Sequence, residues 1–136
     1  MKRFQLIEHT ADTGLVAYGS SLAEAFANAA YGLFSIIAEL DRVREVKSRQ
    51  VAVTAGDVEG LLFNWLNELI YVFEVEHLIL KKFDISKFTG HNLEADCWGE
   101  TYDASRHRLK SGVKSATYHM LEVDDKKNRV QVIFDV

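Results

Sequence analysis

Residues 21–40 read SLAEAFANAAYGLFSIIAEL, and this stretch carries the clearest fold signal in the chain. Its apolar residues recur every three or four positions, which is the spacing of one face of an α-helix. Ser21 followed by Glu24 matches the capping box, in which the two side chains satisfy backbone amides at the start of a helix. The pattern predicts an amphipathic helix over 21–40 that packs on a core.

A second apolar stripe follows in the middle of the chain, after Asp57, whose carboxylate can cap a helix. Its members have helical spacing and are Leu62, Trp65, Leu66, Leu69, Ile70 and Phe73. Both stripes are typical of helix faces that pack on a core rather than of cofactor pockets.

Working outward from the helices, short alternating stretches predict strands. They span residues 4–8, 14–19, 42–54, 77–88, 92–102, 113–123 and 128–134. In 92–102, we expect the face with Glu94 and Glu100 to be exposed to solvent. Helices among runs of strands favour an α+β fold, with two main helices packed on a mixed or antiparallel sheet. At 136 residues, we expect one domain spanning 1–136.

The formal net charge of -4 argues against broad, non-specific binding to nucleic acid. We therefore expect no notable direct contact with nucleic acid. One basic cluster stands out, formed by Arg106, His107, Arg108, Lys110 and Lys114. Such a cluster is usually a solvated loop or strand face.

Cys97 is the single cysteine, so the fold cannot depend on an internal disulfide. Its place in an alternating run, on the side of Leu93 and Ala95, predicts a buried packing thiol. No stretch approaches the ~20 apolar residues of a membrane helix, and nothing resembles a signal peptide. We expect a cytoplasmic protein without a membrane partner.

Motifs for enzymatic chemistry are absent from the sequence. There is no Gly-x-Ser-x-Gly elbow, and the histidines fall in different elements, so we assign no catalytic residues. Neither phosphate-binding glycine pattern occurs. His9 and Asp12 could supply two zinc ligands with His107 or His119 as a third, but without a Cys pair or His-Glu-x-x-His this spacing is a weak signal.

Carboxylates at the two ends of the chain give a better candidate. Asp12 lies in a predicted strand connection, and the sequence ends at Asp135 and Val136, whose α-carboxylate adds a further charge. If the strands at the two ends are neighbours, these groups meet and repel one another. A hard divalent cation would relieve that repulsion. A nearby cationic side chain such as Lys114 is the alternative.

Several segments, in order, resemble the archease family. They are EHTAD at 8–12, Gly19 with LAEAF at 22–26, LLFNWLNELIY at 61–71, LEA at 93–95 with GE at 99–100, VKSATYH at 113–119 and DV at 135–136. The resemblance covers essentially the whole chain. Glu8 departs from it, since the family often has Asp there.

The resemblance implies a protein that activates an enzyme rather than an enzyme itself. Archeases assist the tRNA-splicing RNA ligase that joins a 3′-phosphate to a 5′-hydroxyl end, promoting its guanylylation and turnover. A second implied role is chaperone and specificity modulator of a tRNA cytosine-5 methyltransferase. A small metal-dependent hydrolase and a general chaperone remain competing classes.

The family also implies a bound divalent cation, typically calcium, with magnesium or manganese as alternatives. Its ligands fall here on Asp12, Asp135 and the Val136 carboxylate. We further expect His9 and Lys114 to contact the partner protein or a phosphate.

Overall fold

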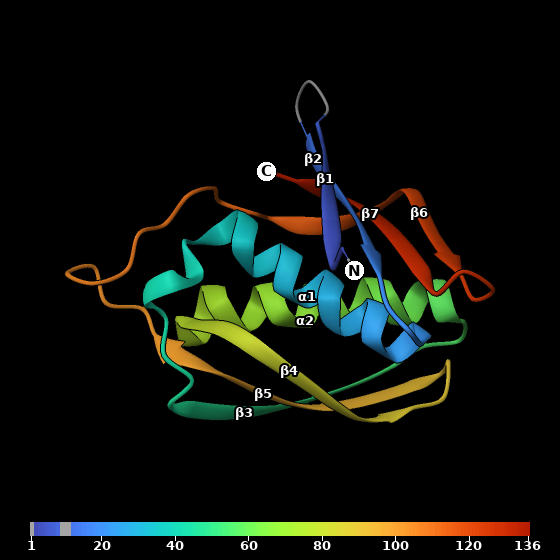
Figure 1. Ribbon diagram of the computed structural model, residues 1–136, viewed down its shortest axis with the longest axis horizontal. Helices are drawn as coiled ribbons and strands as arrows, with labels where there is room; N and C mark the ends of the chain where they lie inside the picture. Colours follow the sequence, from blue (N-terminus) through green and yellow to red (C-terminus); the bar gives the residue numbers. More distant parts are fainter. Residues whose placement is uncertain (1, 9–11) are drawn as a thin grey trace.

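The structure is a computed structural model and describes residues 2–8 and 12–136. Over these residues the chain forms seven strands, two α-helices and one short 3-10 helix (Figure 1). In chain order they are β1 Phe4–Glu8, β2 Asp12–Tyr18, α1 Leu22–Ile37, η1 Leu40–Arg42, β3 Lys47–Thr54, α2 Val58–Glu76, β4 Leu78–Phe88, β5 Asn92–Thr101, β6 Ser115–Asp124 and β7 Arg129–Asp135.

Helix α1 begins as its sequence predicts. The Ser21 hydroxyl accepts a hydrogen bond from the Glu24 amide at 3.1 Å. The Glu24 carboxylate bonds the amide of Ser20, one residue earlier than the capping box requires, at 2.7 Å. The helix ends at Ile37, short of the predicted residue 40, because Ala38 turns to an extended conformation before the tighter turn of η1.

Helix α2 begins after Asp57, whose carboxylate accepts the Gly60 amide at 2.7 Å. It ends at Glu76, and the next residue, His77, adopts the left-handed conformation common after helices, although it is not glycine. The Trp65 indole N–H donates to the Phe26 carbonyl at 3.0 Å. This buried bond joins α2 directly to α1.

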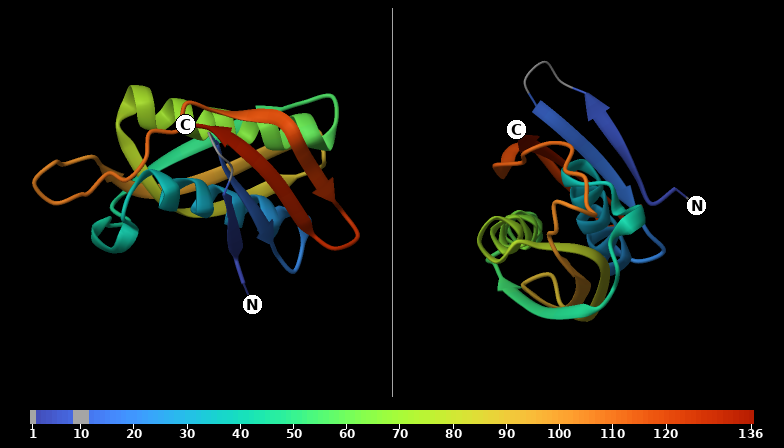
Figure 2. Two further views of the ribbon diagram at one scale, coloured as in Figure 1. Left: turned by 90° about the horizontal axis from the view of Figure 1, so that it is seen from above. Right: turned by 90° about the vertical axis from the view of Figure 1, so that its left-hand side faces the viewer.

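The α+β fold is confirmed, with the helices packed on antiparallel sheet. Over residues 2–8 and 12–136, the strands divide into two antiparallel sheets, in the orders β1-β2-β7-β6 and β3-β5-β4. The two helices lie between these sheets, which makes three layers (Figures 1 and 2). Each helix therefore buries two faces, one against each sheet.

Three strand predictions differ from the structure by two residues or more. The strand predicted over 14–19 begins at Asp12, because Asp12 and Thr13, which were predicted to lie in a strand connection, pair with β7. The strand predicted over 42–54 begins only at Lys47, because η1 and a loop precede it, although Val43 is buried. The strand predicted over 113–123 begins at Ser115 and contains an irregularity between Thr117 and Glu122, where its register against β7 shifts.

Cys97 lies in the core, as predicted, and is fully buried. Burial, with a smaller contribution from Asp96, raises the pKa of its thiol to about 12. The thiol therefore stays protonated and acts as a packing group. In the described ranges 2–8 and 12–136, neither helix combines the length and apolar character needed to cross a membrane.

Candidate functional site

The two predicted carboxylates meet at the edge of the four-stranded sheet. Asp12 is the first residue of β2 and Asp135 the last of β7, and they are direct partners in the antiparallel register. Directly opposite residues place their side chains on the same face, about 5 Å apart at Cβ. Asp12 is half-buried and Asp135 is exposed. The two acidic side chains therefore share one end of the sheet, beside the C-terminus (Figure 1).

Strand β6 completes this edge on the other side of β7. Ser115 is the register partner of Asp135, and the Lys114 amide donates to the Asp135 carbonyl at 2.8 Å. Val136 follows with 38% of its surface exposed. We call Asp12, Ser115, Asp135 and Val136 the strand-end rim.

The rim carries negative charge without an internal counter-charge. Among residues 2–8 and 12–136, no salt bridge involves Asp12 or Asp135. Lys114 contacts the rim through its backbone, and its ammonium is not paired with either carboxylate. The cationic side chain considered as an alternative to a metal is therefore not in that position in the structure.

The donor set of the rim fits a hard cation. Two carboxylates and a neighbouring hydroxyl offer oxygen ligands, which suit calcium, magnesium or manganese. Within the described part of the chain, no three His, Cys, Asp or Glu side chains are grouped closely enough to hold a metal. Further oxygen ligands, such as water, would be needed to complete a coordination shell.

The histidines considered for zinc are placed differently. His9 lies outside the described residues. His107 is bonded through one ring nitrogen to Glu100 at 2.9 Å and through the other to the Asp103 amide at 2.9 Å. His119 is exposed on β6. His107 is thus committed to a different cluster from Asp12.

Strand β6 also presents apolar side chains beyond the rim. Tyr118 is 63% exposed and stacks on Phe63 of α2, with ring centroids 4.1 Å apart. Met120 is 48% exposed and has a φ of 56°, a backbone conformation rare outside glycine. We call Phe63, Tyr118 and Met120 the β6 patch. Nothing in the local sequence signals this irregularity, so the patch was not predicted.

The basic cluster predicted to be a solvated face is partly buried. The His107 side chain has no solvent exposure, and its Nδ1 accepts the Asp103 amide proton, so Nε2 carries the proton donated to Glu100. The same carboxylate also accepts the Arg44 amide at 3.1 Å and pairs with Arg106. Glu100, predicted to be exposed, retains only 13% of its side-chain exposure.

These contacts change the acidity of Glu100. Burial favours the neutral acid, but the Arg44 amide, His107 and Arg106 together outweigh it, so the pKa of Glu100 lies below its ordinary value. We call Arg44, Glu100, Asp103, Arg106 and His107 the Glu100 network. It ties β5 to the loop over 102–114 and serves the fold.

Two helices enclosed by antiparallel sheets, with an acidic strand-end rim, define a class of small α+β proteins, and sequence comparison identifies the family. The chain belongs to the Archease protein family (MTH1598/TM1083), whose model matches residues 4–136. The resemblance found in the sequence is confirmed.

Relatives named "Protein archease" match along the full length. One from Sulfurisphaera tokodaii is 34% identical over 137 residues, which cover 100% of this chain and 99% of the relative. Another, from Saccharolobus islandicus strain Y.G.57.14, is 38% identical over 137 residues with the same coverage.

Solved structures show the same fold. The solution structure of Methanobacterium thermoautotrophicum protein 1598 is 31% identical, with a TM-score of 0.80 and complete coverage of both chains. The crystal structure of a Thermotoga maritima archease, described as a possible chaperone, is 21% identical, with a TM-score of 0.62 over 96% of this chain and 94% of its own. The latter likeness concerns the fold alone.

Proposed function

We propose that this protein is a non-enzymatic activator and chaperone in tRNA splicing, and that it works in the cytoplasm on the RNA ligase that joins 3′-phosphate and 5′-hydroxyl ends. It promotes guanylylation and turnover of that enzyme. Membership of the Archease family supports this proposal. The observation that carries it furthest is the pairing of Asp12 with Asp135 across β2 and β7.

The rim is proposed to hold a divalent cation, calcium first and magnesium or manganese as alternatives. Asp12, Asp135 and the Val136 carboxylate are the proposed ligands. A cation held there would supply positive charge able to attract a phosphate or a carboxylate of the partner. The side chains of the rim hold the charge on the ends of paired strands, which is a firmer support than a loop.

The partner is proposed to dock over the rim and the β6 patch together. Exposed aromatic and methionine side chains are enriched at protein interfaces, and Tyr118 and Met120 follow the rim by only a few residues on β6. Lys114 is exposed, precedes Ser115 at the start of β6 and is proposed to contact the partner or a phosphate. His9 has the same proposed role but lies outside the described residues.

The test is ligase guanylylation measured with the purified ligase, GTP and each variant. Asp12→Asn and Asp135→Asn remove the rim charges while keeping the size of the side chains. Asp125→Asn, in the exposed β6–β7 turn, is the matched control. We expect the rim variants to lose most of the stimulation and the control to retain it. Full stimulation by both folded rim variants would reject the rim as the working surface.

An alternative partner is a tRNA cytosine-5 methyltransferase that the protein keeps soluble and specific. The exposed β6 patch favours this kind of chaperone contact, because apolar surface can cover an aggregation-prone partner. Light scattering of the methyltransferase during heating would show suppression of aggregation, and Tyr118→Ser should reduce it. Suppression that persists after chelation would separate this role from the role of the cation.

A further inference from the structure

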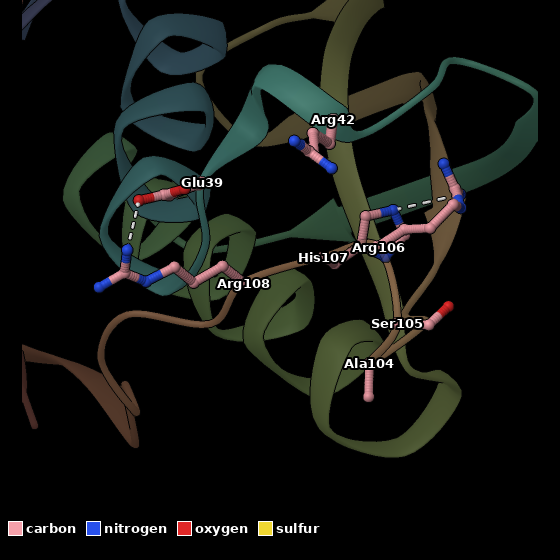
Figure 3. Close-up of a pocket in the computed structure, with 7 residues that line it drawn as sticks. All are labelled: Glu39, Arg42, Ala104, Ser105, Arg106, His107 and Arg108. Carbon is pink, nitrogen blue, oxygen red and sulfur yellow. Dashed lines mark hydrogen bonds and ion pairs between the residues drawn. The ribbon is translucent and has the colours of Figure 1, made fainter.

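A polar hollow lies where η1 faces the loop over 102–114, and neither Asp12 nor Asp135 lines it (Figure 3). Its cavity has a volume of about 280 Å³. The charged side chains on its wall are Glu39, Arg42, Arg106 and Arg108, and Ser105 adds a hydroxyl. A neighbouring depression of about 350 Å³ shares Arg42 and Arg106 and adds Asp41 and Arg44. We call the two together the arginine groove.

The walls of the groove carry an excess of positive charge. Of the side chains that line the two depressions, four are arginines and two are acidic, and two further carboxylates outside the cavity, Glu100 and Asp103, pair with Arg106 alone among these arginines. The side chains of Arg42 and Arg44 form no ion pair or hydrogen bond with any residue in ranges 2–8 and 12–136. Arg108 reaches Glu39 only at 3.5 Å, with both side chains largely exposed. At least two guanidinium groups therefore remain available to a ligand.

Arg106, on the other side of the groove, is held in place by carboxylates that lie outside the cavity. Glu100 and Asp103 pair with the Arg106 guanidinium, and neither of these acids lines the cavity. The oxygens of Glu100 are already occupied by the Arg44 amide, Arg106 and His107. These carboxylates therefore fix the arginine without competing at the open face.

The loop itself is joined to the end of α1. The Glu39 amide donates to the Arg108 carbonyl at 2.9 Å, and the Lys110 amide donates to Ile37 at 2.7 Å. Figure 3 shows Arg42 on the η1 turn above this segment, with Arg106 and Arg108 on opposite sides of it. Because η1 and the loop are fixed to one another, a ligand would find the site largely preformed.

We propose that the arginine groove binds phosphoryl groups. Guanidinium groups match phosphate oxygens with paired, charge-assisted hydrogen bonds. The two depressions share Arg42, so the groove suits two successive anionic groups, as in pyrophosphate, a nucleotide or the backbone of a short RNA. This is local recognition by a few arginines and is consistent with a chain of net charge -4. It does not depend on a cation at the strand-end rim.

Isothermal titration of the full chain in metal-free, low-salt buffer tests the proposal. The probes are pyrophosphate, a short oligoribonucleotide with and without a terminal phosphate, and tetraglutamate as a carboxylate anion. We expect saturable binding of pyrophosphate that weakens as salt rises. Arg42→Gln/Arg44→Gln should weaken it at least about tenfold, since each lost charged hydrogen bond costs roughly that factor.

The matched control is Lys126→Gln/Lys127→Gln, which removes the same charge from the exposed β6–β7 turn. Binding by this control should remain within about twofold of the wild type, because the turn lies outside the groove. Both variants change exposed residues, and a thermal melt checks that each is folded. Tighter binding of the oligoribonucleotide than of pyrophosphate would identify a strand backbone as the ligand, and the reverse a small phosphate compound.

Three results would overturn the proposal. They are no saturable binding of any phosphate probe, equal losses in the arginine and lysine variants, and tighter binding of tetraglutamate than of pyrophosphate. Equal losses would indicate general charge attraction. Preference for tetraglutamate would indicate an acidic protein segment as the occupant.

Discussion

The carboxylates of this protein lie in two opposite environments, one fully hydrogen-bonded and one without a positive partner in the part of the chain that the structure describes. Glu100 is nearly covered and accepts hydrogen bonds from a backbone amide, an arginine and a histidine. Asp12 and Asp135 lie side by side at a sheet edge, and no described residue forms a salt bridge with either. A saturated carboxylate stabilises the fold, whereas two adjacent carboxylates without a partner cost stability until something positive binds them. The contrast separates a structural cluster from a candidate working site.

The largest expected effect concerns the structural side of this contrast. His107→Ala should lower the free energy of unfolding by about 2–4 kcal/mol, because it leaves a cavity and deprives Glu100 and the Asp103 amide of their partner. Urea denaturation followed by circular dichroism measures the change. His119→Ala, at an exposed position on β6, is the control and should change little. Equal losses of unfolding free energy in the two variants would show that the Glu100 network contributes no more to stability than an exposed residue.

The next effect concerns the rim and depends on the cation. Calcium at 100 times its dissociation constant should stabilise the wild type by about 2.7 kcal/mol, because the ligand binds only the folded state. Asp12→Asn/Asp135→Asn should show no such gain and should unfold at a slightly higher temperature without calcium, since two like charges are removed. Thermal melts with and without calcium measure both effects. A calcium-dependent shift that survives in the variant would place the cation elsewhere.

The stability that the Glu100 network contributes should fall as the pH is lowered. The pKa of Glu100 is lower in the folded protein than its ordinary value of 4.5, so the unfolded chain binds more protons in that range. Stability from this group is fully present above pH 4.5 and falls as the pH drops through the folded pKa. Urea melts over a pH series should show a shallower decline for Glu100→Gln than for the wild type. Identical slopes would contradict the assignment.

The smallest effect on stability is expected at Lys114. Lys114→Gln keeps the backbone bond to Asp135 and removes an exposed ammonium, so the free energy of unfolding should change by less than about 0.5 kcal/mol. If the side chain contacts the partner, ligase stimulation should nevertheless fall. Lys126→Gln provides the comparison. Unchanged stimulation would contradict a contact between the Lys114 side chain and the partner.

Local signals in the sequence predicted the helices well. The Ser21 and Asp57 caps mark helix starts through chemistry contained within one turn, and both caps form. The end of the first helix was less accurate, because the chain leaves the helix at Ala38 without a glycine or proline that would signal it. The strand predicted over 42–54 was too long, because Val43 is an apolar, buried residue and fits the strand pattern although it lies in the loop before β3.

Long-range arrangement was harder to predict. The division into two sheets depends on β2 meeting β7 and β3 meeting β5, and these pairings leave no trace in local periodicity. The meeting of Asp12 with Asp135 could be stated only as a condition on strand order. Glu100 and His107 were each interpreted as solvated, because alternation within β5 does not show that the chain turns back after the strand and brings two residues seven positions apart into contact.

The buried thiol in β5 has a practical consequence for studying this molecule. Cys97 is the single cysteine, has no exposed surface and remains protonated at ordinary pH. A maleimide dye or spin label should therefore not react with the native chain. One cysteine introduced at Lys126, in the exposed turn between β6 and β7, would become a unique attachment point. Site-specific labelling for fluorescence or spin-label spectroscopy therefore does not require replacement of the native cysteine.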